Sequence, residues 1–386
     1  MSFEKDIAAL NEFYFFREFT FSHTTFQPTP IQEVELADNV IWLGDNLLIY
    51  QLKERGAVQK ATPESEIDWF ENKVLGKATR QIRDTLAYLQ ANAEIKLKNH
   101  RAHEFCLRSA TIKHIHKLVV YLPHASFPAT SQSLKFYRSK TAGIIHVFSA
   151  RDYKGLVQTL LTPAEFAEYL EFREALIDNW EQNLRELPEQ AIVGQYLIGK
   201  FEQPSVKFVK YLEAIEHNAE EWDMSGIISN FPERTTSMNN PMDYYHIVRE
   251  IAQLKRSGLR EFKKRFQFSF ERAKANKFTK PYRMASPYTG CGFVFIPITQ
   301  ELIPKRQNAL INLTHALKYS EKLSKCVGVS VAHEKDGWFN VEWCFLEFPW
   351  EEDRDMDEKL QQNNPFRDAK TVELKRYDFK QPENLK

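Results

Sequence analysis

The sequence predicts an α/β protein with an N-terminal sandwich built on a mixed sheet, a helical middle region and a C-terminal β-α-β-β unit. Two observations carry this prediction. Strand-like runs of branched and aromatic residues fill the N-terminal part and return near the C-terminus, and longer stretches with helical periodicity lie between them. We therefore expect a first domain over residues 1–150, a helical region over 151–285 and a C-terminal domain with its tail over 286–386.

Length and charge limit the possible functions. With 386 residues the chain exceeds the usual size of one domain, so more than one core is expected. The 52 basic and 52 acidic side chains give a formal net charge of zero, so any phosphate-binding site has to be a local patch. Four cysteines without CxxC spacing suit reduced thiols. Because a signal-peptide pattern and long apolar runs are both lacking, we expect a cytoplasmic protein without membrane contact.

The first elements follow from local periodicity. Residues 4–16 place apolar side chains at helical spacing, and residues 19–22 alternate as in a strand. Pro28 and Pro30 then predict an irregular loop, because proline fixes φ and lacks a backbone donor.

A tight β-hairpin over residues 35–55 is the centre of the first domain. Two strand-like runs flank the sequence Gly44-Asp45-Asn46, whose residues tolerate the positive φ of a two-residue turn. We expect Asp45 and Asn46 to form that loop.

This register brings polar residues together at one end of an otherwise apolar hairpin. Asp38 is expected opposite Lys53, and Val40 opposite Gln51, and directly opposite residues share a sheet face. A buried charged cluster is costly unless its members are paired or bind a metal. Asp38, Gln51 and Lys53 are therefore candidate site residues.

An Asp at a strand start, followed by a hairpin and an acid-or-Gln-x-Lys triplet, resembles the PD-(D/E)XK nuclease superfamily. Gln51 and Lys53 match its Gln-x-Lys form, which is that of the Mrr-type restriction branch, although Ala37 replaces the usual Pro. The resemblance implies a restriction-endonuclease-like sandwich in which Asp38 and Gln51 hold Mg²⁺, or Mn²⁺, and Lys53 orients the attacking water. Because Gln51 contributes an oxygen but no charge, a further carboxylate is needed.

The resemblance also implies that a Glu on the first helix completes the metal site. Glu12 is our preferred candidate, and Glu18 is the second. Glu35 is a third, because it lies just before Asp38. A solvated helix position is an equally good interpretation of Glu12.

A long helix is expected to follow the hairpin. Thr62-Pro63 is a helix-start signal, and the apolar periodicity continues to about Gln90. The resemblance implies that this helix presents a polar residue to the active site, either Gln81 or Lys77. A solvated basic face is the alternative, and we favour it for both.

His114 and His116 alternate on the strand expected over residues 112–121. Alternate histidines on a strand can form a metal pair. Because the sequence shows no third ligand nearby, we favour ordinary surface or packed histidines.

The rest of the chain lacks a recognisable catalytic motif. Helical patterns follow Thr162-Pro163 and recur over residues 204–222 and 241–277, without a Walker-type Gly-rich loop. A strand over 292–298, a helix over 302–325 and a hairpin over 327–348 then make the β-α-β-β unit.

Residues 249–283 carry twelve basic side chains against three acids, a local charge of +9, with phenylalanines between them. Cations and aromatic rings at this density favour a phosphate backbone or a single strand. Lys263, Lys264 and Arg265 are the expected nucleic-acid contacts, together with Lys77. The alternative is an amphipathic helix whose cations pair with the acidic run 351–358.

The sequence thus predicts a metal-dependent nuclease that cleaves nucleic acid, DNA favoured, in restriction or anti-phage defence. The rival is a non-catalytic nucleic-acid-binding or complex-forming protein with a degenerate nuclease fold. A partner protein of a defence complex and a homo-oligomer both remain open.

Overall fold

The computed structural model describes residues 2–22, 24–29, 32–56, 61–99, 101–128, 134–236, 240, 242–286, 289–367 and 375–380. The chain forms two compact units: unit 1 is Met1–Glu216 with Tyr377–Lys386, and unit 2 is His217–Arg376. The predicted α/β fold, with a mixed sheet and a separate C-terminal sheet, is confirmed. Residues 151–216, expected in a separate helical region, belong to unit 1, because helices after residue 150 pack on the N-terminal sheet.

Unit 1 begins with a helix, a series of strands and a long helical segment. These are α1 (Phe3–Phe15), β1 (Thr20–Ser22), β2 (Thr25–Thr29), β3 (Gln32–Glu35), β4 (Asn39–Leu43), β5 (Asn46–Glu54), α2 (Pro63–Trp69), η1 (Phe70–Lys77) and α3 (Ala78–Ala91). The unit continues with β6 (Glu94–Lys98), β7 (Glu104–Arg108), η2 (Ser109–Thr111), β8 (His114–Leu122), β9 (Phe136–Ser139), β10 (Gly143–Ser149), α4 (Ala150–Leu160), α5 (Pro163–Glu186), α6 (Glu189–Leu197), η4 (Val206–Phe208) and α7 (Val209–Ala214).

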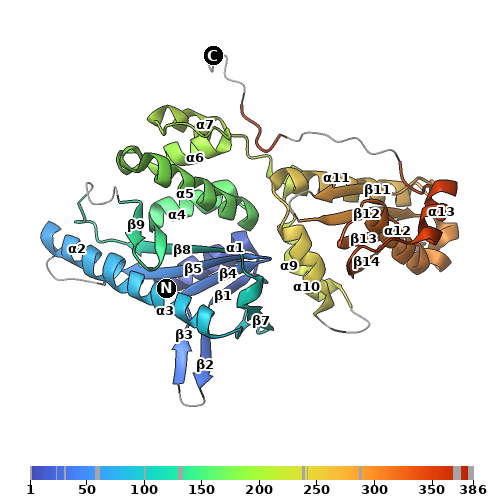
Figure 1. Cartoon of the computed structure of the whole chain (residues 1–386). Coiled ribbons are helices and arrows are strands. Elements are labelled where there is room, and N and C mark those ends of the chain that lie inside the picture. The colour runs from blue at the N-terminus through green and yellow to red at the C-terminus, as the bar shows by residue number, and fades with distance from the viewer. Residues whose placement is uncertain are drawn as a thin grey trace. The chain divides into compact units, whose positions relative to one another are not determined.

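The main sheet of unit 1 has the strand order β1-β4-β5-β8-β10-β9. β8 runs parallel to both β5 and β10, and the other neighbours are antiparallel. One face packs against α1, α4 and α5. The other face packs against η1 and α3, so the sheet lies between two helical layers (Figure 1).

The central strand β5 is buried on both faces. Tyr50 and Leu52 belong to the core beneath α1, α4 and α5, whereas Ile49 belongs to the core beneath α3. Because successive strand residues point to opposite faces, Gln51 and Lys53 lie on the face that α3 covers.

The β4–β5 hairpin turns one residue earlier than the sequence predicted. Leu43 pairs with Asn46, so Gly44 and Asp45 form the loop. Gly44 has φ +62°, which glycine adopts without steric cost, whereas a side chain there would be strained. The predicted register is therefore wrong by two residues along β5. A shift of two residues leaves every side chain on its predicted face, so the expected clustering survives.

β2 and β3 pair as an antiparallel two-stranded ribbon, and their residues 27–29 and 32 lie where a loop was expected. Pro28 lies within β2, and the pairing of β2 with β3 is irregular on either side of it. A two-stranded ribbon has open edges, so a proline that lacks an N–H can be accommodated there. Pro30 lies outside the described residues.

The long helix after the hairpin begins as predicted. Thr62 and Ser65 cap each other reciprocally, and Pro63 occupies the first turn. The helix then runs to Ala91 through the π-helical segment η1. Such segments are rare and occur frequently at functional sites. This one ends one turn before Gln81.

The described residues 377–380 belong to unit 1. Phe379 forms an antiparallel bridge with Ile215, and the N–H of Glu216 donates to the carbonyl of Asp378 at 2.8 Å. Tyr377 is buried in the core beneath α5. Unit 2 is therefore inserted between two adjacent segments of unit 1.

Unit 2 contains a four-stranded sheet and several helices. They are α8 (Ala219–Trp222), α9 (Ser225–Arg234), α10 (Asp243–Ala252), α11 (Arg256–Lys274), β11 (Tyr282–Ser286), β12 (Cys291–Ile298), η5 (Gln300–Lys305), α12 (Arg306–Ser320), β13 (Lys325–His333), β14 (Phe339–Glu347) and α13 (Arg354–Gln362). β12 and β13 are parallel and joined by α12, and β11 and β14 are antiparallel edge strands.

Helices cover both faces of the unit 2 sheet. Phe262 of α11 packs on Phe293 and Phe295, whereas α12 packs on the other face. A Cβ on Gly328 would lie 1.9 Å from Oγ1 of Thr314, so this glycine lets α12 approach β13 closely. None of the helices within the described ranges has the length and apolarity needed to cross a membrane.

Candidate active site

The structure brings Asp38, Gln51 and Lys53 together at one end of the β4–β5 hairpin. Nζ of Lys53 donates to Oδ2 of Asp38 and to Oε1 of Gln51, each at 3.1 Å, and to the carbonyl of Leu52 at 2.9 Å. Oδ2 of Asp38 also accepts the N–H of Leu52 at 2.6 Å. The three residue types that the sequence singled out therefore form one connected cluster.

The backbone just before Asp38 is anchored by two threonines from different parts of the chain. Oγ1 of Thr24 donates to the carbonyl of Ala37 at 2.6 Å and accepts its N–H at 3.0 Å. Oγ1 of Thr85, on α3, donates to the carbonyl of Leu36. These bonds fix the backbone just before β4. Asp38 is therefore held in place by Thr24, which lies just before β2, and by Thr85 of α3.

The residue after Asp38 is fixed from the opposite face of the sheet. Nδ2 of Asn11, on α1, donates to Oδ1 of Asn39 at 2.8 Å. The hydroxyl of Tyr153 donates to Oδ1 of Asn11 at 2.5 Å and lies 3.1 Å from that of Tyr50. All of these side chains are buried, and a fully satisfied polar network of this kind rigidifies its surroundings.

A small cavity of about 130 Å³ opens beside Asp38. Its lining comes from β3, the β4–β5 hairpin and α3, namely Val34, Glu35, Asp38, Gln51, Gln81, Asp84 and Tyr88. Gln81, Asp84 and Tyr88 are spaced along one stripe of α3, as the helical repeat requires. The volume suits an ion with a few waters, because each water occupies about 30 Å³ of liquid.

The donor set of this cavity fits a hard divalent cation. Glu35, Asp38 and Asp84 offer carboxylates, and together with the ammonium of Lys53 they carry a formal charge of −2. Gln51 and Gln81 add amide oxygens, and Oε1 of Gln81 is buried without a hydrogen-bond partner among the described residues. Oxygen ligands are those that Mg²⁺ prefers. The donor types therefore fit the metal that the resemblance implies, whereas Glu35, Asp38 and Asp84 do not bring three ligand atoms within 4.8 Å of one another.

The structure distinguishes the three glutamates that the sequence left open. Glu35 lines the cavity. Glu12 does not, because α1 packs on the opposite face of the sheet through Phe3, Ile7 and Phe15. Glu18 is buried and pairs with Arg101 at 2.9 Å, away from the cavity lining, and burial raises the pKa of its carboxyl.

Lys77 and Gln81 lie on one face of the long helix. Gln81 reaches the cavity, and Lys77 is exposed one turn before it, at the end of η1. Lys77 is thus on the side of α3 from which Gln81, Asp84 and Tyr88 project, but it is not part of the lining.

The basic segment of unit 2 uses several of its cations within the unit. Nζ of Lys263 donates to the carbonyls of Glu220 at 2.6 Å and Asp223 at 3.2 Å. Arg265 pairs with Glu261 and donates to a carbonyl of β11. Lys264 is exposed.

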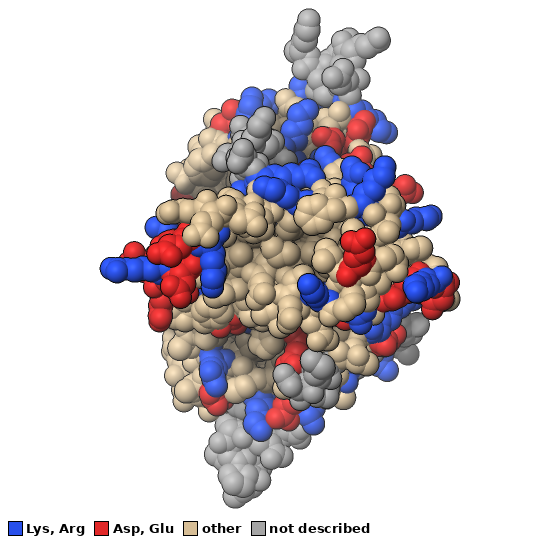
Figure 2. Space-filling model, turned by 90° about the vertical axis from the view of Figure 1, so that its right-hand side faces the viewer, with Lys and Arg blue, Asp and Glu red and all other residues tan. Residues whose placement is uncertain are grey.

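Two further ion pairs of the segment are formed with acids outside the run 351–358. Arg260 pairs with Glu221 at 3.3 Å, and Arg283 with Glu321 at 2.6 Å. On the face that Figure 2 draws, basic and acidic side chains are intermixed around a wide uncharged area. Within the expected triplet, Lys264 is the exposed member, whereas Lys263 and Arg265 are half-buried.

Four residues of the site were not identified from the sequence, namely Asp84, Tyr88, Thr24 and Thr85. The polar stripe on the long helix was visible as helical spacing. This stripe faces Asp38 because of the way α3 packs across the sheet. Such long-range packing leaves no local pattern in a single sequence. The two threonines act through backbone contacts, which leave no sequence signature.

Comparisons with known proteins identified no relative of this chain. No family model, no curated protein and no solved structure matches this chain. The residues of the site are therefore the basis on which its function can be inferred.

Proposed function

We propose that this chain is a metal-dependent nuclease that hydrolyses phosphodiester bonds, with DNA as the favoured substrate. The observation that carries the proposal is the convergence of Asp38, Gln51 and Lys53. Their spacing resembles that of PD-(D/E)XK nucleases, and they meet beside a cavity lined with further carboxylates.

Mg²⁺ or Mn²⁺ would be held by Asp38 and Gln51 with a further carboxylate from Glu35 or Asp84. When bound, such an ion lowers the pKa of a water ligand and neutralises phosphate charge. This further carboxylate would supply the charge that the neutral Gln51 lacks. It would take the place that the sequence predicted for Glu12.

Lys53 is the residue that would meet the reacting phosphate. Its ammonium donates all of its three N–H groups inside the site, to Asp38, Gln51 and the carbonyl of Leu52. To take part in hydrolysis it exchanges one of these bonds for a phosphate oxygen or the attacking water. Its positive charge then stabilises the negative charge that develops at the phosphate. Asp38 stays oriented meanwhile, because it also accepts the N–H of Leu52.

Gln81 supports the same chemistry from α3. Its buried amide oxygen faces the cavity without a partner among the described residues, so it can accept a hydrogen bond from a bound water. It would thereby orient the nucleophile rather than activate it.

A second candidate is a non-catalytic nucleic-acid-binding protein that has kept the nuclease fold. The completeness of the Lys53 contacts favours it, because a lysine whose three donors are already satisfied needs no substrate. The two candidates differ in whether bonds are broken.

The test is cleavage of plasmid DNA and of a structured RNA by the purified full chain, with Mg²⁺ or Mn²⁺ and with a chelator. We expect metal-dependent cleavage that Lys53→Met abolishes. Lys73→Met is the matched control, since Lys73 is an exposed lysine on η1. Metal-dependent cleavage that persists in Lys53→Met would rule out this active site. No cleavage by the wild type, combined with tight binding, would favour the non-catalytic candidate.

We further propose a role in restriction or anti-phage defence. The support is architectural: unit 2 is a compact insertion, and the residues of the proposed active site all come from unit 1. Cells that express the wild type should form fewer phage plaques than cells that express Asp38→Asn. Equal plaque counts over a broad phage panel would contradict this role and leave the nuclease assignment intact.

A further inference from the structure

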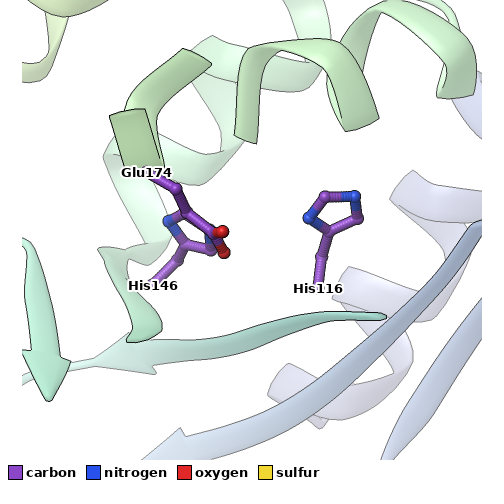
Figure 3. A group of neighbouring side chains, drawn as sticks. All are labelled: His116, His146 and Glu174. Atoms are coloured by element: carbon purple, nitrogen blue, oxygen red, sulfur yellow. The ribbon is translucent and has the colours of Figure 1, made fainter. Parts of the chain in front are cut away.

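Two histidines and a glutamate cluster on the sheet face opposite the proposed active site. His116 lies on β8, His146 on the parallel neighbour β10, and Glu174 on α5, which covers this face. One ligand atom of each residue lies within 4.8 Å of the other two. Figure 3 shows the carboxylate of Glu174 beside the His146 ring, with the His116 ring across a gap from both.

Burial makes this cluster unusual. His116 and His146 are 3% and 0% exposed, whereas the Glu174 side chain is 32% exposed and reaches solvent. Nε2 of His116 is buried and has no hydrogen-bond partner among the described residues. Leaving a buried polar atom unpaired is unfavourable.

A second layer of residues fixes His146. Nη1 of Arg173 donates to Nδ1 of His146 at 2.9 Å, and Arg173 itself is held by Glu189 through contacts of 2.8 and 3.2 Å. Because a guanidinium only donates, Nδ1 accepts and the ring proton lies on Nε2, which is 3.2 Å from Oε1 of Glu174. A cation at Nε2 would displace that proton to solvent, and Arg173 would still donate to Nδ1.

An exposed pair lies next along the same two elements. His114 is two residues before His116 on β8, and Glu171 is one helical turn before Glu174 on α5. Nδ1 of His114 is 3.3 Å from Oε1 of Glu171, and each side chain is 48% exposed. This pair has the same chemistry as the buried cluster without its enclosure, so it provides a matched control.

We propose that His116, His146 and Glu174 bind a zinc ion, at a site distinct from the proposed nuclease centre. Two imidazole nitrogens and one carboxylate, with a fourth position open to water, form a donor set typical of zinc, whereas Mg²⁺ and Ca²⁺ prefer oxygen alone. Ligand atoms around tetrahedral zinc are about 3.4 Å apart. The three ligand atoms lie within 4.8 Å of one another, so zinc binding would draw these side chains closer together. The ion thereby ties α5 to β8 and β10.

The test is zinc binding by the full chain after treatment with a chelator. Zinc is titrated by equilibrium dialysis in the presence of excess Mg²⁺, Co²⁺ is added separately as a spectroscopic probe, and the melting temperature is recorded with and without zinc. We expect one zinc per chain, a visible Co²⁺ band typical of low coordination number, and a higher melting temperature with zinc. Glu174→Gln and His116→Asn should each lower zinc affinity at least about 10-fold and remove the Co²⁺ band.

The control is the double variant His114→Asn/Glu171→Gln, which should keep the wild-type stoichiometry, affinity and band. Unchanged zinc affinity in Glu174→Gln would overturn the proposal and assign the binding to surface histidines. Failure of the wild type to bind zinc at micromolar concentrations would overturn it as well. If His116→Asn does not fold, the partly exposed Glu174→Gln still decides the question.

Discussion

The Asp38 cluster of unit 1 and the basic segment 249–283 of unit 2 are both dense charge patterns, yet the fold uses them differently. Asp38, Gln51 and Lys53 come from two adjacent strands and meet within 3.1 Å beside a cavity. The basic segment is divided between α10, α11 and the approach to β11, and Lys263 and Arg265 donate to groups of their own unit.

The geometry of the two elements explains the contrast. Alternate residues of paired strands share a face, so a strand motif gathers its side chains at one place. Successive residues of a helix are rotated by about 100°. The consecutive cations Lys263, Lys264 and Arg265 therefore point in three directions, and only a helical spacing would have collected them on one surface. A run of like charges in a helix is thus weaker evidence for a binding site than a spaced triplet in a hairpin.

Removing the carboxylate of Asp38 should have the largest effect. We expect Asp38→Asn to lower metal-dependent cleavage on the order of 10²–10³-fold, because a neutral amide holds a cation poorly. The amide oxygen can still accept the N–H of Leu52, so the melting temperature should change little. The exposed Asp68 of α2 provides the control variant Asp68→Asn. A folded Asp38→Asn protein that cleaves at the wild-type rate would contradict the role of the Asp38 cluster. The cluster would then have no better claim to a site than the basic segment.

Adding a charge at Gln51 should have the next largest effect. Gln51 is 2% exposed and lies beside Asp38. In the metal-free protein, Gln51→Glu should lower the free energy of unfolding by about 1–3 kcal/mol, because it places a second carboxylate in a buried site. Millimolar Mg²⁺ or Mn²⁺ should restore the melting temperature, and cleavage should persist. A loss of stability that neither ion reverses would count against a metal site.

The triple variant Lys263→Ala/Lys264→Ala/Arg265→Ala tests the structural role of the basic segment. It removes the bonds from Lys263 to the carbonyls of Glu220 and Asp223. We expect unit 2 to lose about 1 kcal/mol, or roughly 2–4 °C in melting temperature. An unchanged melting temperature would show that these bonds add nothing to stability, and the nucleic-acid interpretation of the whole triplet would then be preferred.

The smallest expected effect is on nucleic-acid affinity. Lys264→Ala and Lys77→Ala remove exposed cations, so each should weaken binding slightly and without sequence preference. The slope of affinity against salt concentration should fall by about 0.7–0.9 for each phosphate that is no longer neutralised. Fluorescence anisotropy with labelled DNA at several salt concentrations measures this. An unchanged slope in Lys264→Ala would leave α11 with a purely structural role.

Much of the proposed active site could be predicted from the sequence because it is local. The hairpin spacing brought Asp38, Gln51 and Lys53 together even though the turn was misplaced, since a two-residue shift preserves the sheet face. The turn itself was ambiguous because Gly44-Asp45-Asn46 offers two loops of equal length. The structure forms the Gly44-Asp45 loop, in which the glycine takes the positive φ.

The parts that depend on long-range packing could not be predicted. Whether Glu12 or Glu35 joins the cavity depends on which face of the sheet α1 covers. The group that we propose as the third zinc ligand, Glu174, lies 58 positions after His116 and on another element, so the strand pattern alone favoured an ordinary histidine. The assignment of residues 377–380 to unit 1 depends on their contacts with residues 214–216 at the end of α7, which are distant in the sequence.

That returning segment also sets an order of events during synthesis. Ile215 and Phe379 pair only after the ribosome has made the whole of unit 2, because unit 2 lies between them in the chain. Domains generally fold as they emerge, with N-terminal parts first. Here the first unit to be started is the last to be completed, and a chain interrupted inside unit 2 leaves Ile215 and its neighbours without the partner that buries them. A truncated product therefore exposes apolar surface around Ile215 that the complete chain buries.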